Sequence, residues 1–83
     1  MGSLTVNVLD EDQNPISGKN VYCNFPRSFL AVLPTKSECS TDDDGIVEFD
    51  EVPVGAVEIY VDGEMQMEIQ MDSGEHKDVT ITI

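Results

Sequence analysis

TDDDGIVEFDEVPVGAVEIYV, residues 41–61, decides the fold of this chain. Gly45 follows three aspartates and predicts a turn, because glycine adopts a positive φ without a Cβ clash. Residues 46–49 form a short β-rich run, and Pro53 then interrupts any hydrogen-bond ladder because it has no N–H. Residues 56–61 alternate, with Val57, Ile59 and Val61 on one face and Glu58 and Tyr60 on the other, which is the period of a strand. The stretch therefore predicts a turn, a strand, a corner and a second strand.

The same period-two alternation recurs on both sides of this stretch. Segments 4–8, 19–25, 36–40, 64–71 and 78–83 each suit a short strand, and turn-forming residues separate most of them. Asp62-Gly63 predicts a two-residue hairpin of the type I′ kind. No helical period is long enough to indicate a helix. About seven or eight short strands at this spacing predict an all-β antiparallel sandwich or barrel. We expect these side chains to be largely buried: Val6, Val8, Val21, Phe25, Val47, Phe49, Val57, Ile59, Ile69 and Ile81.

Length and charge limit the classes of function. Eighty-three residues suit one small domain, which we place at residues 4–83, with 1–3 as a possible cloning remnant. Seventeen acidic and four basic residues give a net charge of −13, which disfavours nucleic acid and anionic membranes as partners. No apolar run approaches the ~20 residues that cross a bilayer. The acids are spread along the chain, which favours a solvated surface over a high-salt habitat or a basic partner.

Two segments resemble a known family. Residues 6–23, VNVLDEDQNPISGKNVYC, and residues 41–60 are similar in order and spacing to the two signatures of carboxypeptidase regulatory-like domains. These domains are transthyretin-like (prealbumin-like) and related to collagen-adhesin B-type repeats. The resemblance implies a seven-stranded, Ig-like Greek-key β-sandwich that serves as an accessory, spacer or binding module.

The chain also departs from these relatives. Lys19 stands where the family usually has a small residue, and we expect its ammonium to reach the sheet edge. The first strand has no Lys and the last has no Asn, so the isopeptide bond of some adhesin relatives is not expected. The single His and single Arg do not match the related hydrolases.

Acidic turns are the only candidate metal sites that the sequence offers. Residues 10, 12 and 14 have the spacing of a calcium loop, but Pro15 and Val21 stand where an EF-hand needs Gly and Glu. Asp42 and Asp44 remain candidates for an irregular Ca²⁺ site. Two solvated turns are the favoured alternative, because aspartate suits turns through its own backbone hydrogen bonds.

The remaining reactive side chains do not form a recognisable catalytic set. Cys23 and Cys39 lack the spacing of a zinc site, and both a disulfide and two buried free thiols stay open. His76 lies in a predicted turn, where an exposed, non-catalytic histidine is the favoured interpretation. The methionines at 65, 67 and 71 share one face with Ile69, which favours core, with a partner-binding face as the alternative.

Residues 29–33, FLAVL, form an apolar run between Pro26 and Pro34 that does not alternate. Either this run is core at the end of the sandwich, or it contacts a partner through Phe29, Leu30, Val32 and Leu33. We therefore expect a non-catalytic structural or protein-interaction module with no cofactor. It would bind a protein partner or assemble with itself, in an extracellular, cell-surface or virion setting. The alternative is a module that binds a small ligand or a carbohydrate, although the chain has no Trp and only Tyr22 and Tyr60 on outward phases.

Overall fold

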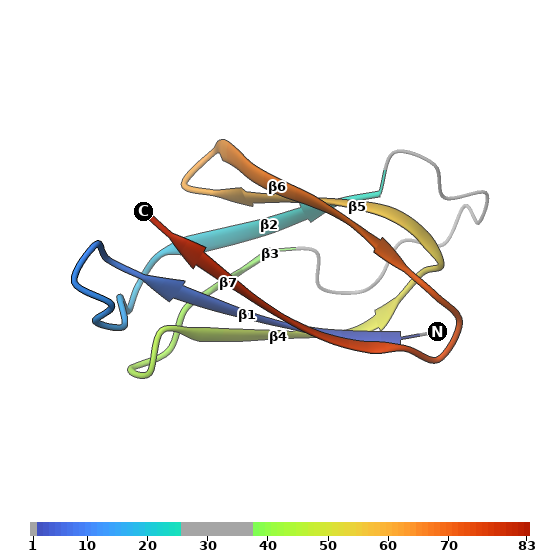
Figure 1. Cartoon of the computed structure of the whole chain (residues 1–83), viewed down its shortest axis with the longest axis horizontal. Helices are drawn as coiled ribbons and strands as arrows, with labels where there is room; N and C mark the ends of the chain where they lie inside the picture. Colours follow the sequence, from blue (N-terminus) through green and yellow to red (C-terminus); the bar gives the residue numbers. More distant parts are fainter. Residues whose placement is uncertain (1, 26–37) are drawn as a thin grey trace.

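The computed structural model describes residues 2–25 and 38–83, which form two packed β-sheets (Figure 1). Within these residues the strand bounds are β1 Gly2–Leu9, β2 Asn20–Asn24, β3 Glu38–Ser40, β4 Ile46–Val52, β5 Gly55–Val61, β6 Glu64–Met71 and β7 His76–Thr82. One sheet has the order β4-β1-β7 and the other the order β3-β2-β5-β6. The predicted all-β sandwich is confirmed. The described part of the chain holds no helix long and apolar enough to cross a membrane.

The first and last strands lie side by side and run in the same direction. β1 pairs in parallel with β7, from Ser3 opposite His76 to Leu9 opposite Thr82. The other pairs, β1–β4, β2–β3, β2–β5 and β5–β6, are antiparallel, as the sequence predicts. The parallel pair departs from the fully antiparallel expectation. Alternation fixes which face of a strand is buried but carries no information on the direction of its neighbour.

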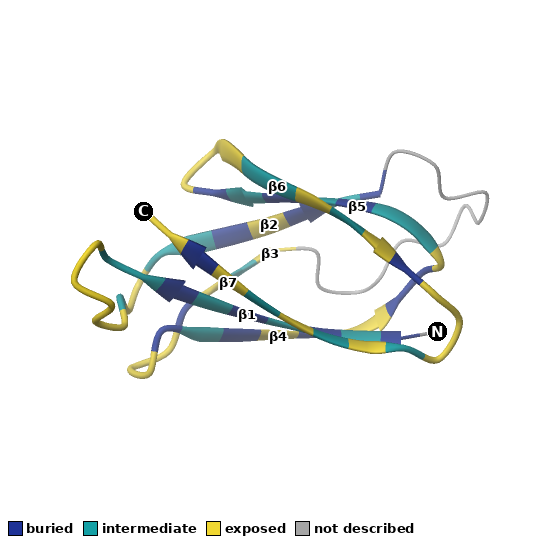
Figure 2. Cartoon of the chain, in the orientation of Figure 1, coloured by how far each residue is buried: buried dark blue, intermediate teal, exposed yellow. Residues whose placement is uncertain are grey.

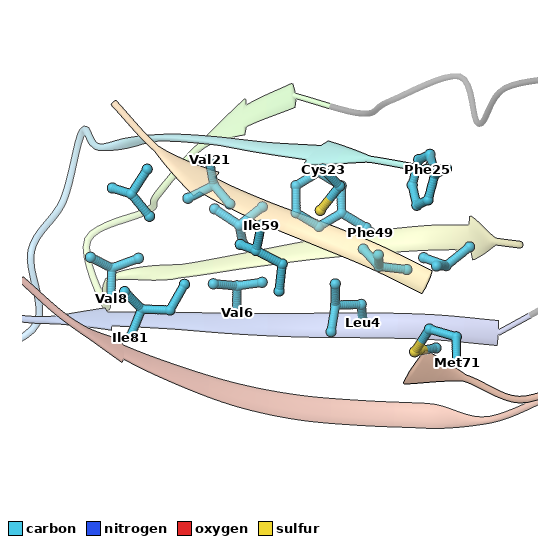
Figure 3. Packing of buried hydrophobic residues seen from close by; sticks show 14 residues of the cluster. Leu4, Val6, Val8, Val21, Cys23, Phe25, Phe49, Ile59, Met71 and Ile81 are labelled. Atoms are coloured by element: carbon cyan, nitrogen blue, oxygen red, sulfur yellow. The ribbon is translucent and has the colours of Figure 1, made fainter. Parts of the chain in front are cut away.

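Apolar side chains from both sheets meet between the layers (Figures 2 and 3). The buried apolar residues are Leu4, Val6, Val8, Val21, Cys23, Phe25, Val47, Phe49, Val52, Val57, Ile59, Val61, Met71 and Ile81. Nine of the ten side chains expected to be buried are in this set. The tenth, Ile69, is half-buried and packs against the cluster, because β6 is the last of the described strands in its sheet and no other described strand pairs with its outer side.

A bulge in β6 changes the direction of one methionine. Ile59 faces Met67, but the next residue, Tyr60, faces Met65, so that two residues of β6 oppose one of β5. The extra residue moves Met65 off the inward stripe, and 49% of its surface is exposed. Met67 is half-buried and Met71 is fully buried, as the core interpretation of the stripe requires. The sequence prediction that Met65 shares their face is therefore wrong.

The turn between β5 and β6 confirms the two-residue hairpin that Asp62-Gly63 predicts. Asp62 and Gly63 have φ values of 51° and 85°, and the two positive angles are those of a type I′ turn. Gly45 has a φ of 71°, and a Cβ atom there would lie 2.8 Å from the Val8 carbonyl oxygen. Both the backbone angle and the close approach therefore require glycine at position 45.

Thr41 ties two loops together at the end of the sandwich. It is the one buried polar residue among those described, with 5% of its surface exposed. Its hydroxyl donates to the Ile16 carbonyl oxygen at 2.7 Å and accepts from the Lys19 N–H at 2.9 Å. Backbone bonds from Thr41 N–H to the Lys19 carbonyl and from Gly18 N–H to the Thr41 carbonyl complete the connection. The link holds the entry to β2 against the exit from β3.

Candidate interaction surface

A row of aromatic and polar side chains crosses the outer face of the four-stranded sheet. The register places Glu38 of β3 opposite Tyr22 of β2, Tyr22 opposite Tyr60 of β5, and Tyr60 opposite Met65 of β6. Directly opposed residues share one face of a sheet and lie within side-chain reach. Tyr22 and Met65 are both among the exposed large apolar side chains. The bulge therefore places Met65 at the end of this row, beside Tyr60.

The two tyrosine rings frame an open pocket. Their centroids lie 5.9 Å apart, and their planes are tilted by 48°. The pocket has a volume of about 370 Å³, and its lining comprises Asn20, Tyr22, Glu38, Tyr60 and Gly63. We call these five residues the tyrosine pocket. Its described lining thus combines two tyrosines with an asparagine, a glutamate and a glycine.

Carboxylates dominate the electrostatics around the tyrosine pocket. Desolvation and the neighbouring Glu58 carboxylate raise the pKa of the Tyr60 phenol above its usual value. Glu58 also accepts a hydrogen bond of 2.8 Å from the Asn24 side-chain amide, which fixes its position on the sheet. The phenol is therefore neutral at physiological pH, and the fixed charge beside it is negative.

The hairpin between β5 and β6 is anchored beside the pocket by an ion pair. The Lys19 ammonium lies 3.0 Å from a carboxylate oxygen of Asp62, and the other oxygen accepts from the Asn20 N–H at 3.2 Å. Both contacts hold the pKa of Asp62 below its usual value, with the Lys19 hydrogen bond as the larger cause. The Lys19 ammonium thus lies at the surface beside the β5–β6 hairpin, paired with Asp62, and Lys19 itself adjoins β2, an inner strand of the sheet and not an edge strand.

One of the two candidate Ca²⁺ ligands, Asp42, binds the backbone of its own turn. One oxygen of Asp42 accepts from the N–H groups of Asp44 and Ile46, at 2.9 and 3.0 Å. Asp10 repeats this arrangement toward the N–H groups of Asp12 and Asn14. No cluster of three potential ligands occurs within residues 2–25 and 38–83. These contacts match the turn interpretation of both acidic segments.

A serine, a histidine and an aspartate line up at the junction of β1 and β7. Ser3 Oγ lies 2.6 Å from His76 Nδ1, and His76 Nε2 lies 3.4 Å from an Asp78 carboxylate oxygen. This row is not apparent from the sequence, because it is the parallel register of β1 and β7 that brings Ser3 and His76 together. The side chains of His76 and Asp78 are 54% and 67% exposed. A hydroxyl nucleophile needs a base held in place by an oriented, largely buried acid, and water screens this pair.

Both cysteines are free thiols. Cys23 is buried in the core, and burial raises the pKa of its thiol to about 12. Cys39 is half-buried on β3, opposite Val21. Of the two alternatives that the sequence leaves open, the structure has two free thiols, but only Cys23 is buried as that alternative requires.

The predicted partner-binding residues Phe29, Leu30, Val32 and Leu33 lie outside the described residues, so their role stays a prediction. The tyrosine pocket was not predicted as a site, although the outward phases of Tyr22 and Tyr60 are readable from the sequence. What the sequence lacks is the register that makes these two residues direct neighbours. The β6 bulge that adds Met65 has no glycine or other local signal.

Comparison with known proteins shows the class of fold. No family model and no curated protein matches the chain. Among solved structures, the Bacillus anthracis TIE protein superposes with a TM-score of 0.76 at 19% identity, over 98% of this chain and 16% of that one. BcpA, the major pilin subunit of Bacillus cereus, gives 0.77 at 15% identity, over 98% of this chain and 29% of that one. A streptococcal ancillary pilin gives 0.67 at 14% identity, over 96% and 31%.

These structures share the β-sandwich of this chain almost from end to end. The chain spans less than a third of the length of each of them. The resemblance to carboxypeptidase regulatory-like domains has no matching family model and stays a prediction.

Proposed function

We propose that the chain is a non-catalytic structural module of a cell-surface or extracellular assembly. In this role the polypeptide enters the domain at one end and leaves it at the other. The observation that carries this proposal is the parallel pairing of β1 with β7. In a sandwich whose first and last strands are antiparallel neighbours, the polypeptide enters and leaves at one end. Here it enters β1 at one end and leaves β7 at the other, as Figure 1 shows for the N and C labels.

The dimensions of the domain suit such a role. Its extents are 38 × 22 × 19 Å, so it is elongated, and β1 and β7 run along the long axis (Figure 1). Copies joined from β7 to β1 would extend as a rod, and a pull on the two ends would load the β1–β7 hydrogen bonds together, in shear. Superposition on pilin subunits supports the proposal, because such a subunit holds this fold as one part of a longer chain. The side chains of His76 and Asp78 in the Ser3–His76–Asp78 row are exposed, so water screens their charges. This exposure supports the non-catalytic assignment.

Small-angle X-ray scattering on three tandem copies tests this role. With Ile83 of one copy joined directly to Ser3 of the next, the proposal predicts that the maximum dimension grows with each added copy by about the Ser3–Ile83 distance, roughly 23 Å at ~3.3 Å per residue, plus the joining peptide bond. The single domain, measured under the same conditions, provides the reference. A tandem whose maximum dimension stays below that of two domains placed end to end would contradict the proposal.

We also propose that residues 29–33 contact a protein partner or a second subunit. The support is the unbroken apolar sequence between Pro26 and Pro34. Leu30→Glu and Leu33→Glu, made separately, should give at least one variant that stays folded by circular dichroism but loses assembly in light scattering. If both variants unfold the domain, the segment is core and the partner site lies elsewhere.

A further inference from the structure

The tyrosine pocket has no part in the end-to-end role, and its chemistry points to a ligand. We propose that it binds a lysine or arginine side chain presented by a basic segment of a protein partner. This inference goes beyond the structural role and does not depend on it, because the pocket lies on the outer face of the sheet and not at either end of the β1–β7 pair.

The two rings supply the first attraction. A ring face attracts a cation that sits within about 6 Å of its centroid. The centroids of Tyr22 and Tyr60 are 5.9 Å apart, which leaves no room for a cation between the rings, but an ammonium or guanidinium group that lies over the pair is within that range of both centroids. Tyr22 stands across the strand pair from Tyr60 in register, and the backbone hydrogen bonds of β2 and β5 hold this spacing. The rings are thus positioned before a ligand arrives.

Charge supplies the second attraction. Glu38 contributes a carboxylate to the pocket lining, and Glu58 adds a fixed negative charge beside Tyr60. Among the residues that the structure describes, none of those lining the pocket is basic. Of the basic residues in the described part of the chain, Lys19 is bound to Asp62 at 3.0 Å and Lys77 lies 3.8 Å from Glu75. A ligand cation would therefore meet a carboxylate that no described lysine neutralises.

The same features disfavour other occupants. A second copy of the chain carries the same charge of −13, so like charges would oppose its approach to this face. A sugar ring stacks best on flat aromatic surfaces, whereas the two rings here are tilted by 48°. A lysine ammonium is compact and needs no flat platform, and an arginine guanidinium can stack on one ring alone. A partner with exposed Lys or Arg side chains therefore matches both the shape of the pocket and its negative charge.

Nuclear magnetic resonance titration with an acetylated and amidated pentapeptide, GRGRG, tests the proposal on the intact chain. The control peptide carries citrulline in place of arginine and has the same shape without the charge. We expect the arginine peptide to shift the ring signals of Tyr22 and Tyr60, with a smaller or no effect from the citrulline peptide. Lactose is the probe for the carbohydrate alternative, and a shift by lactose but not by the arginine peptide would overturn the proposal in favour of sugar binding.

Three variants locate the binding. Tyr60→Leu removes one ring and should weaken peptide binding by about two- to fivefold, as expected for one exposed cation–π contact. Glu38→Gln removes the charge of the pocket and should also weaken binding by about two- to fivefold. Glu11→Gln is the matched control, because it has the same net charge and lies in the exposed turn after β1. Equal weakening by Glu38→Gln and Glu11→Gln would show general charge attraction only and would refute a site in the pocket.

Discussion

Replacing Thr41 by valine tests how the loops at one end of the sandwich are held. Valine has nearly the shape of threonine but no hydroxyl, so the backbone can stay in place while two hydrogen bonds disappear. The Ile16 carbonyl loses its donor at 2.7 Å, and the Lys19 N–H loses its acceptor at 2.9 Å. Thr41→Ser keeps the hydroxyl and removes only the methyl group, which makes it the matched control.

The expected loss follows from these two contacts. Leaving a buried polar group without a partner costs about 1–3 kcal/mol, and a typical hydrogen bond contributes about 0.5–1.5 kcal/mol. Ile16 and Lys19 are only half-buried, so water can reach part of the vacated space. We therefore expect Thr41→Val to lower the free energy of unfolding by about 1–3 kcal/mol. For a domain of this size, a loss of about 2 kcal/mol corresponds to roughly 8–16 °C in melting temperature.

Urea unfolding followed by circular dichroism measures this loss, together with a thermal melt. The midpoint should fall in Thr41→Val with an unchanged slope, and Thr41→Ser should lie closer to the parent chain. A Thr41→Val variant as stable as the parent would refute the role given to this hydroxyl. A larger loss in Thr41→Ser than in Thr41→Val would show that the methyl group matters more than the hydrogen bonds.

Three further predictions concern thiols, acid and salt. An alkylating reagent at pH 8 should modify Cys39 in the native protein and Cys23 only after unfolding, because burial raises the Cys23 pKa to about 12; mass spectrometry showing two rapid additions would contradict this. The depressed pKa of Asp62 stabilises the fold above its unfolded value of about 3.8, and this stability is lost as pH falls through the folded pKa. Asp62→Asn should therefore lower the melting temperature at pH 7, and the difference in melting temperature between Asp62→Asn and the parent should shrink as the pH falls below 3.8 and through the depressed pKa. A difference that does not shrink would exclude the Lys19 pair as the cause. The melting temperature should rise from low salt to about 0.15 M, where the Debye length is ~8 Å; a flat response would indicate locally neutralised acids.

The sequence predicts the layers of this fold well because burial and strand period are local properties. Alternation in residues 56–61 places Val57, Ile59 and Val61 inward, and all three are buried in the structure. The hairpin at Asp62-Gly63 is equally local, since two positive φ angles suit these residue types. Each of these features depends on a few neighbouring residues, which is the information that a period or a dipeptide contains.

Features that depend on strand pairing could not be predicted in the same way. The parallel β1–β7 pair joins residues more than seventy positions apart, and no local pattern fixes its direction. The Ser3–His76 contact and the Tyr22–Tyr60 pair both follow from register. The exposed position of Met65 follows from a bulge that shifts the register by one residue. The candidate site therefore emerges only once the strands are placed.

The distance between the two ends of the β1–β7 pair tests the structural role most directly. Ile83 lies seven residues beyond His76, the partner of Ser3, so the two Cα atoms should be about 23 Å apart at ~3.3 Å per residue. Spin labels at Ser3→Cys and Ile83→Cys, in a Cys39→Ser background with Cys23 left buried, report this distance by double electron–electron resonance. A distribution centred between about 20 and 30 Å, with allowance for the labels, is the predicted result. Strong dipolar broadening from labels within about 10 Å would show opposed strand ends and contradict the end-to-end module.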